Sequence, residues 1–216
     1  MPSLTEENYL KALFHLAPGA SDTVPTSELA AHLDVSKPTV TSMLKTLARR
    51  GYVAYAPYRP PQLTESGRRA AAAVVRKHRL TEMFLVEKMG FDWAEVHAIA
   101  EQIEHIDAPE FFARMDDLLG YPTVDPHGSP IPDPAGRVRR EVFRPLSDLA
   151  VGSVVRLRAI GNSSAELLQF LTHKGIALDT ELTLVRREPF DGSLVVRYAA
   201  REESLSAEVG RCLLVA

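Results

Sequence analysis

Residues 36–51 read SKPTVTSMLKTLARRG, and this stretch decides the fold of the N-terminal third. Ser36 is a favourable N-cap, Pro38 suits the first turn of a helix because its missing N–H needs no partner there, and Gly51 ends the helix. Apolar residues recur at i, i+3, i+4 and i+7 and predict a buried stripe of Val40, Met43, Leu44 and Leu47. We therefore expect a helix that is capped by Ser36 and runs to about Arg50.

The face of this helix opposite the apolar stripe is short-chained and polar near its start and cationic further along. Such a face can enter the major groove of DNA, with small polar groups at base edges and Lys or Arg at phosphates. Without a nucleic-acid partner, which is the alternative, these cations would have no evident role. We predict a DNA-contacting set that adds one residue of the preceding helix and one of a wing: Thr26, Ser36, Lys37, Pro38, Thr39, Thr41, Ser42, Lys45, Arg49 and Arg59.

The segments on either side predict a winged helix-turn-helix. An amphipathic first helix is expected after the capping-type start at residues 3–6, and a short second helix over Thr26–His32. Downstream, residues 52–55 and 62–64 have strand character and flank a turn that contains Pro57 and Arg59. Two short strands around such a turn predict a wing with Arg59 near its tip.

Charge is distributed unevenly along the chain, although the formal net charge is only −3. Residues 36–79 contain ten Lys or Arg and one acidic residue, whereas residues 80–135 contain twelve Asp or Glu and two basic residues. A basic block followed by an acidic block is expected of a DNA-contacting part beside a cation-collecting part. Uneven surface charge without a function is the alternative.

Residues 93–111 carry the clearest metal-ligand pattern. On a helical wheel, four potential ligands share an arc of about 100°: His97, Glu101, Glu104 and His105. The opposite side is apolar and predicts a core stripe of Val96, Ile99, Ile103 and Ile106. Upstream, His78 and Glu82 form an i, i+4 pair on a helix expected over 74–89. Carboxylates and imidazoles on adjacent helices can hold a transition metal, and a set without thiolate suits manganese or ferrous iron better than structural zinc.

Three alternatives to a metal-regulated site stay open. The residues could be solvated helical charges, which is the usual role of any one of them taken alone. Residues 101–105 (EQIEH) superficially resemble an inverted zinc-peptidase motif, but that motif needs His where Glu101 stands. A winged-helix regulator that senses an organic ligand would leave the ligand arc without a purpose. We expect no catalytic residues and no enzyme activity.

Ordered motifs along the chain resemble the diphtheria-toxin-repressor family of metal-dependent transcriptional regulators, in its manganese-responsive, three-domain branch. They are residues 36–40 (SKPTV), 76–82 (RKHRLTE), 93–97 (WAEVH), 101–105 (EQIEH) and 127–132 (HGSPIP), so the match runs through nearly the whole chain. The resemblance implies a homodimer that represses metal-uptake genes. Its winged helices would bind double-stranded operator DNA once Mn²⁺ or Fe²⁺ is bound, with further divalent transition metals acting in vitro.

The resemblance also implies where metals bind. It places Asn8, Glu101, Glu104 and His105 in a primary site, and His78, Glu82 and His97 in an ancillary site. The iron-responsive branch has Cys at the position of Glu101, and the manganese-responsive branch has Glu. Asn8 departs from the family's usual Asp or Met. Lys11 replaces a Glu of the two-domain manganese regulators, so their closely spaced binuclear site is not expected here.

Further ligands are implied outside the two helices. Residues 120–136 contain five prolines and three glycines, which predicts a stiff, irregular linker. In three-domain manganese regulators, linker positions that match Asp125 and His127 help to hold the second metal; an exposed loop histidine is the alternative. Glu166 is a further candidate carboxylate, or else a capping-box residue three positions after Ser163.

The last third changes to strand patterns, over residues 154–160, 181–187 and 194–199, with a hairpin turn at Asp191-Gly192 and a short helix over 165–172. It resembles the small SH3-like barrel of ferrous-iron-transport protein A. We therefore predict an α+β fold of three domains: a winged helix-turn-helix (1–72), a helical dimerisation and metal-binding domain with its Pro-rich linker (73–142), and an SH3-like β-barrel (143–216).

Apolar runs, the first residues and the cysteine content all bear on the cellular location of the protein. No apolar run approaches the about 20 residues that span a bilayer, and the first residues lack the pattern of a signal peptide. Cys212 is the single cysteine, so no internal disulfide can form. We expect a cytoplasmic protein without a membrane partner.

Overall fold

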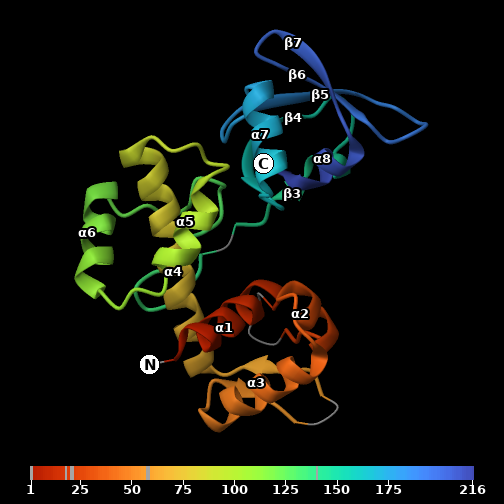
Figure 1. Ribbon diagram of the computed structural model, residues 1–216. Helices are drawn as coiled ribbons and strands as arrows, with labels where there is room; N and C mark the ends of the chain where they lie inside the picture. The colour runs from red at the N-terminus through yellow and green to blue at the C-terminus, as the bar shows by residue number, and fades with distance from the viewer. Residues whose placement is uncertain (1, 18, 20–21, 57–58, 140) are drawn as a thin grey trace.

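The computed structural model describes residues 2–17, 19, 22–56, 59–139 and 141–216. The predicted α+β class is confirmed, as three successive bodies (Figure 1). They are a helical N-terminal body with a two-stranded ribbon, a group of helices around the upper half of one long helix, and a sheet with short helices. No helix of the described residues combines the length and hydropathy needed to cross a bilayer.

The N-terminal body forms because three short helices bury their apolar faces on one another: α1 (Leu4–Leu16), α2 (Thr26–His32) and α3 (Lys37–Arg49). A capping box starts α1, because the Glu6 N–H donates to Ser3 Oγ and the Ser3 N–H donates to the Glu6 carboxylate. The predicted cap of α3 is confirmed, since Ser36 Oγ accepts from the Thr39 N–H. Three of the four residues of its predicted stripe are fully buried: Val40, Leu44 and Leu47.

The predicted wing is present, with shorter strands than expected. β1 (Val53–Ala54) and β2 (Gln62–Leu63) pair antiparallel. Arg59 is exposed in the connection between them, and Pro57 lies outside the described residues.

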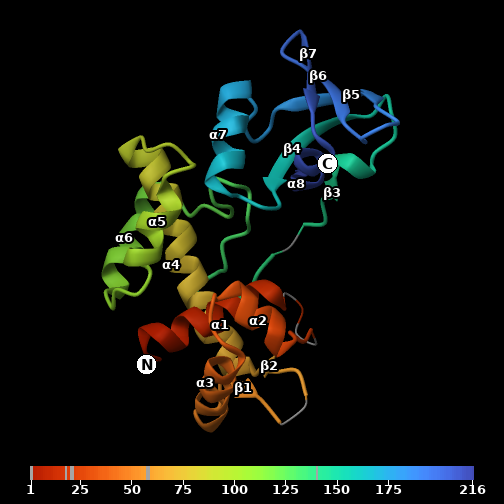
Figure 2. The same cartoon turned by 45° about the vertical axis from the view of Figure 1, so that its right-hand side comes forward.

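One continuous helix, α4 (Glu65–Met89), passes from the N-terminal body into the helical body (Figures 1 and 2). Thr64 caps its start, and Gly90 ends it with a φ of 73°, in the left-handed region that favours glycine. The helix begins nine residues before the predicted position 74, because Thr64 provides a cap and the alanines at 70–73 have high helix propensity. The domain boundary expected at 72/73 therefore falls inside this helix.

The ligand stretch predicted as one helical face divides into α5 (Val96–Ile103) and α6 (Pro109–Leu119). Pro109 starts α6, where its missing N–H removes no helical hydrogen bond. The predicted core stripe is only partly correct, because Val96 is buried but Ile106 is 45% exposed. The buried residues of α5 are Val96 and Ala100, whereas the ligand residues His97 and Glu101 are 65% and 38% exposed at their side chains.

The Pro-rich linker runs against the C-terminal body. The Ile160 N–H donates to the His127 carbonyl oxygen over 2.9 Å. Gly128 has a φ of +84°, and a Cβ there would lie 2.1 Å from the Arg158 backbone oxygen. Only glycine fits this close approach without displacing the linker.

The C-terminal body is an antiparallel sheet with strand order β3-β8-β4-β5-β6-β7. The strands are β3 (Arg144–Pro145), β4 (Val154–Ile160), β5 (Glu181–Arg187), β6 (Leu194–Tyr198), β7 (Arg201–Leu205) and β8 (Leu213–Val215). Three short helices accompany them: η1 (Leu146–Asp148), α7 (Ala165–Lys174) and α8 (Ala207–Cys212). Among the described residues the ladder ends at β3 and β7, so the SH3-like sheet is open rather than a closed barrel.

Candidate metal centre

The candidate metal centre lies where α4 packs against α5. His78 and Glu82 are one helical turn apart on α4, and His97 and Glu101 are one turn apart on α5. Residues at i and i+4 project from the same face, so the two pairs meet across the helix–helix contact. The α4 pair is buried, with His78 7% and Glu82 3% exposed.

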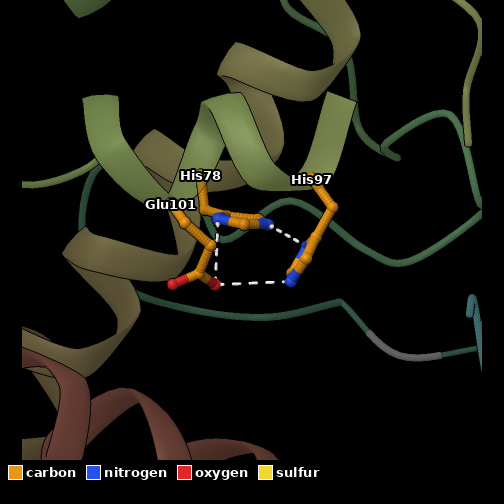
Figure 3. A group of neighbouring side chains, drawn as sticks. All are labelled: His78, His97 and Glu101. Atoms are coloured by element: carbon orange, nitrogen blue, oxygen red, sulfur yellow. Dashed lines mark hydrogen bonds and ion pairs between the residues drawn. The ribbon is translucent and has the colours of Figure 1, made fainter. Parts of the chain in front are cut away.

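Three of these side chains form a group that we call the His97 cluster: His78, His97 and Glu101 (Figure 3). Each offers one ligand atom, and these atoms all lie within 4.8 Å of one another. His97 Nδ1 is 3.2 Å from His78 Nε2, and His97 Nε2 is 3.5 Å from Glu101 Oε1. His97 is 65% exposed at its side chain, so this cluster opens to solvent.

A second group, the His127 cluster, consists of Glu82, Asp125 and His127, all buried. The linker positions the last two side chains. Asp125 Oδ1 accepts hydrogen bonds from the N–H groups of His127 and Ser129, at 2.8 and 2.9 Å, which fixes its carboxylate in a turn. Candidate ligand atoms of this cluster also lie within 4.8 Å of one another.

The ring of His127 is oriented for metal binding. Its Nε2 is 2.9 Å from the backbone oxygen of Trp93, which can only accept, so Nε2 carries the proton. In a neutral ring, Nδ1 then has a free lone pair. That atom lies 3.8 Å from Glu82 Oε2 and 4.0 Å from Asp125 Oδ1, too far for a hydrogen bond. Three electron-pair donors facing one another at this spacing fit a cation between them.

The metal-free site has charges that burial makes costly. Burial opposes the charged form of His78, but hydrogen bonds with Glu104 and Glu82 outweigh it and raise its pKa from 6.5 to about 9. Burial likewise opposes charge on Glu82, yet hydrogen bonds with His78 and His97 lower the pKa of that carboxyl. Burial, and then the charge of Glu82, raise the pKa of Asp125. A divalent cation in the His127 cluster would relieve this repulsion.

Glu101 and Glu104, which the resemblance assigns to the primary metal site, are both bound by a lysine side chain. We call this place, where Lys11 of α1 reaches α5, the Lys11 junction. Lys11 Nζ donates to Glu101 Oε1 and to Glu104 Oε1, each over 2.6 Å. His105 Nδ1 is 2.7 Å from Glu7 Oε2, so α1 contacts this segment a second time. Asn8 Oδ1 is buried and has no hydrogen-bond partner among the described residues.

Six of the ten predicted ligands lie in the two clusters: His78, Glu82, His97, Glu101, Asp125 and His127. Glu104 is buried beside them, with its Oε2 2.5 Å from His78 Nδ1, but it belongs to neither cluster, and neither do Asn8 and His105. Glu166 is exposed in the first turn of α7 and is also outside both. Its capping-box alternative is wrong, because Ser164, not Ser163, caps α7 and accepts from the Leu167 N–H.

Sequence reasoning missed the roles of Glu7 and Lys11 in holding α1 against α5. Their i, i+4 spacing places both on one face of α1, which is the available signal. That signal alone does not say which helix the face will meet.

The predicted DNA-contacting face of α3 is exposed in the structure. Two of the predicted residues, Thr26 and Thr41, are half-buried. The others are exposed: Ser36, Lys37, Pro38, Thr39, Ser42, Lys45, Arg49 and Arg59. Arg49 also donates to Thr46 Oγ1 within the helix.

Three families match consecutive parts of the chain. Residues 2–60 match the iron dependent repressor N-terminal DNA binding domain, and residues 64–133 match the iron dependent repressor metal binding and dimerisation domain. Residues 144–216 match the FeoA domain. The order of the matches follows the order of the three bodies.

Individual relatives agree with these families. The diphtheria toxin repressor of Corynebacterium efficiens is 32% identical over 205 residues, which cover 90% of this chain and 87% of that protein. The iron-dependent repressor IdeR of Mycobacterium tuberculosis is 40% identical over 128 residues, 59% of this chain and 55% of that protein. The chain thus spans about half the length of the IdeR relatives that it matches.

Solved structures match over nearly the full length. A manganese-dependent transcriptional repressor in complex with manganese has a TM-score of 0.88 at 34% identity, covering 98% of this chain and 99% of that chain. ScaR with bound Cd²⁺ has a TM-score of 0.81 at 27% identity, covering 100% of this chain and 99% of that chain.

Proposed function

Because the chain belongs to the iron-dependent and diphtheria-toxin repressor family, we propose that it is a manganese-responsive DNA-binding repressor of metal-uptake genes. It acts in the cytoplasm as a homodimer, with domains over residues 1–72, 73–142 and 143–216. Relatives named for iron and for manganese match the chain, and Fe²⁺ is therefore the second candidate effector.

The observation that carries this proposal is the buried His127 cluster. Glu82, Asp125 and His127 would hold the metal, with the adjacent His78 and His97 as neighbouring donors. Carboxylate and imidazole donors without a thiolate suit manganese or ferrous iron. The bound cation would neutralise carboxylates from α4 and the linker and hold these segments together.

The exposed face of α3 is the proposed DNA-reading surface. Its small residues near the N-terminus, Thr39 and Ser42, would meet base edges, and Lys45 and Arg49 would contact phosphates. Arg59 of the wing would contact the backbone beside the groove. The isoleucine side of α5 and the exposed face of α6 supply an apolar surface for a second copy, with Ile106, Phe111 and Leu118 43–62% exposed.

A direct test measures DNA binding with and without metal. Duplexes selected from a random-sequence pool by the purified protein in manganese are used in fluorescence anisotropy, with either a chelator or added Mn²⁺. We expect binding to tighten at least about tenfold with manganese, since useful allosteric couplings are of that size. Glu82→Gln should abolish the manganese effect, whereas Glu87→Gln, an exposed carboxylate on the same helix, should leave it intact.

The remaining outcomes discriminate between functions. Binding that is equally tight in chelator would remove metal dependence and favour a regulator of a different kind. Metal-dependent hydrolysis of peptides without DNA binding would favour the metallohydrolase, but no catalytic residue is proposed, because Glu101 stands where a zinc-peptidase motif needs His.

A further inference from the structure

Helix α1 reaches the metal-ligand helix through a lysine. Lys11 is 9% exposed, and its ammonium is 2.6 Å from one oxygen of Glu101 and 2.6 Å from one oxygen of Glu104. Glu104 has no exposed surface at all. A carboxylate taken fully out of water needs a compensating charge, and His78 and Lys11 both contact that of Glu104, one at each oxygen.

The same two carboxylates are the ones that the family resemblance assigns to the primary metal. Their inner oxygens are already shared by one cation, which donates to both. His105 is engaged as well, since its Nδ1 is 2.7 Å from Glu7 and its Nε2 is 3.4 Å from Glu104. Three of the four residues that the resemblance assigns to the primary site, Glu101, Glu104 and His105, are therefore engaged without a metal, whereas the buried Asn8 Oδ1 has no hydrogen-bond partner among the described residues.

We propose that the Lys11 ammonium is a built-in cation that replaces the primary metal at the junction of α1 with α5. The proposal rests on the proposed function and specifies its regulation: α1 is joined to α5 in every state of the chain, and free metal is sensed only at the neighbouring clusters. Lys11 acts as a positioning residue.

A hydrogen-bond chain connects the junction to the His127 cluster. Glu104 contacts Lys11 through Oε1 and His78 Nδ1 through Oε2, the latter over 2.5 Å. His78 Nε2 is 3.0 Å from Glu82 Oε1, and Glu82 is a member of the His127 cluster. A metal held by Glu82 therefore acts on the α1 contact through two intervening side chains.

Metal stoichiometry tests the replacement without any DNA. The full chain and its variants are stripped with chelator, titrated with Mn²⁺ alone in a calorimeter, and assayed for bound metal after gel filtration. Lys11→Met keeps the apolar stem but removes the charge, which leaves Glu101, Glu104 and His105 as an unfilled ligand set. We expect it to bind one more manganese ion per chain than the wild type, whereas Lys11→Arg, which keeps a cation, should not.

A second set of variants covers the case in which Lys11→Met does not fold. With Lys11 intact, Asn8→Ala and His105→Ala should bind as many manganese ions as the wild type, with affinities within about twofold. Loss of one ion in either variant would show that a metal occupies the junction and would overturn the proposal.

Amide hydrogen exchange in α1 adds a readout that stoichiometry does not give. In metal-free wild type, the amides of residues 7–14 should be protected. In metal-free Lys11→Met their exchange should be faster by about tenfold or more, because a hydrogen bond to a charged group is worth that factor. Manganese should restore the protection. Equal exchange in both metal-free proteins would overturn the proposal.

These experiments distinguish failure of the inference about Lys11 from failure of the proposed function. If manganese activates DNA binding and Glu82→Gln abolishes the effect, but Lys11→Met gains no ion, only the inference about Lys11 fails. If wild type binds no manganese while Lys11→Met gains one ion, the inference stands and the proposed function fails.

Discussion

His78 is a buried residue whose protonation differs between the metal-free protein and its unfolded chain. Its pKa is about 9 in the fold against an ordinary 6.5, so the folded state holds a proton that the unfolded state releases between these values. This contribution to the free energy of unfolding is fully present below pH 6.5 and is lost as the pH rises through 9. The shift corresponds to about 3 kcal/mol as an upper bound, because Glu82 and Glu104 share the same interactions.

Urea unfolding of the chelator-treated protein at pH 6.5, 8 and 9.5 checks this expectation. His78→Gln is the comparison, because it keeps a polar side chain that cannot be protonated in this range. The wild type should lose more stability than the variant over the interval. Parallel pH profiles for the two proteins would show that His78 is not the titrating group.

At the scale of elements, α3 should contribute the salt dependence of DNA binding. Removing Lys45 and Arg49 together should weaken binding to every duplex and flatten the slope of log affinity against log salt by about two units, near one for each phosphate left without its cation. Anisotropy titrations at several salt concentrations measure that slope. Because Arg49 also bonds Thr46 within the helix, thermal unfolding should accompany the measurement.

Two control variants distinguish the contribution of charge at the phosphates from recognition of the base sequence. Lys88→Ala removes an exposed cation from the far end of α4 and should leave the slope unchanged. Ser42→Ala should alter the preference among sequences and leave the slope as it is. If the Lys45/Arg49 double variant keeps the wild-type slope, the DNA surface lies elsewhere.

Elements with local signals could be predicted from the sequence. The cap at Ser36 and the stripe through Leu44 depend on residues within one helix, and the structure has both. β7 (Arg201–Leu205) was not predicted, because its sequence REESL is mostly polar and its strand state comes from pairing with β6. Such pairing is a tertiary contact that propensity does not contain.

The candidate site also combines contacts that follow from local sequence spacing with contacts that depend on tertiary packing. The pairs His78/Glu82 and His97/Glu101 could be found because i, i+4 spacing on a helix is a local rule. The contact between Lys11 and Glu101 joins residues separated by 90 positions and depends on how α1 docks. Glu166 lies in the first turn of α7, and its distance from the metal centre depends on how the C-terminal body packs against the helical body. The family pattern does not contain that packing.

At the scale of the whole molecule, the C-terminal body supports the metal-ligand linker through Gly128. Gly128→Ala would place a Cβ 2.1 Å from the Arg158 backbone oxygen and should push the linker, with Asp125 and His127, away from β4. We expect manganese affinity to fall at least about tenfold, since displaced ligands lose their fixed geometry. Calorimetric titration with Mn²⁺ measures the change.

Gly152→Ala is the matched control. Gly152 also has a positive φ, of +91°, but a Cβ there meets nothing within 4 Å. Both variants carry the backbone strain of a left-handed residue, of about 1–2 kcal/mol, and only Gly128→Ala carries the clash. Equal manganese affinities in the two variants would show that the sheet does not position the linker.

The unbroken course of α4 has a mechanical consequence. Its 25 residues form a rod about 37 Å long, rooted in the DNA-reading body at one end and bearing His78 and Glu82 further along. α4 contains no proline, and its one Ser-Gly pair, Ser66-Gly67, lies in the first turn, so we expect no sharp bend between that turn and the metal ligands. A tilt of about 5° at Glu82, about 26 Å from the start of the helix, then swings that start by about 2 Å, more than half of the spacing of adjacent base pairs. In a dimer, the separation of the two α4 helices near the metals would therefore set the separation of the two DNA-binding bodies at the grooves of the duplex.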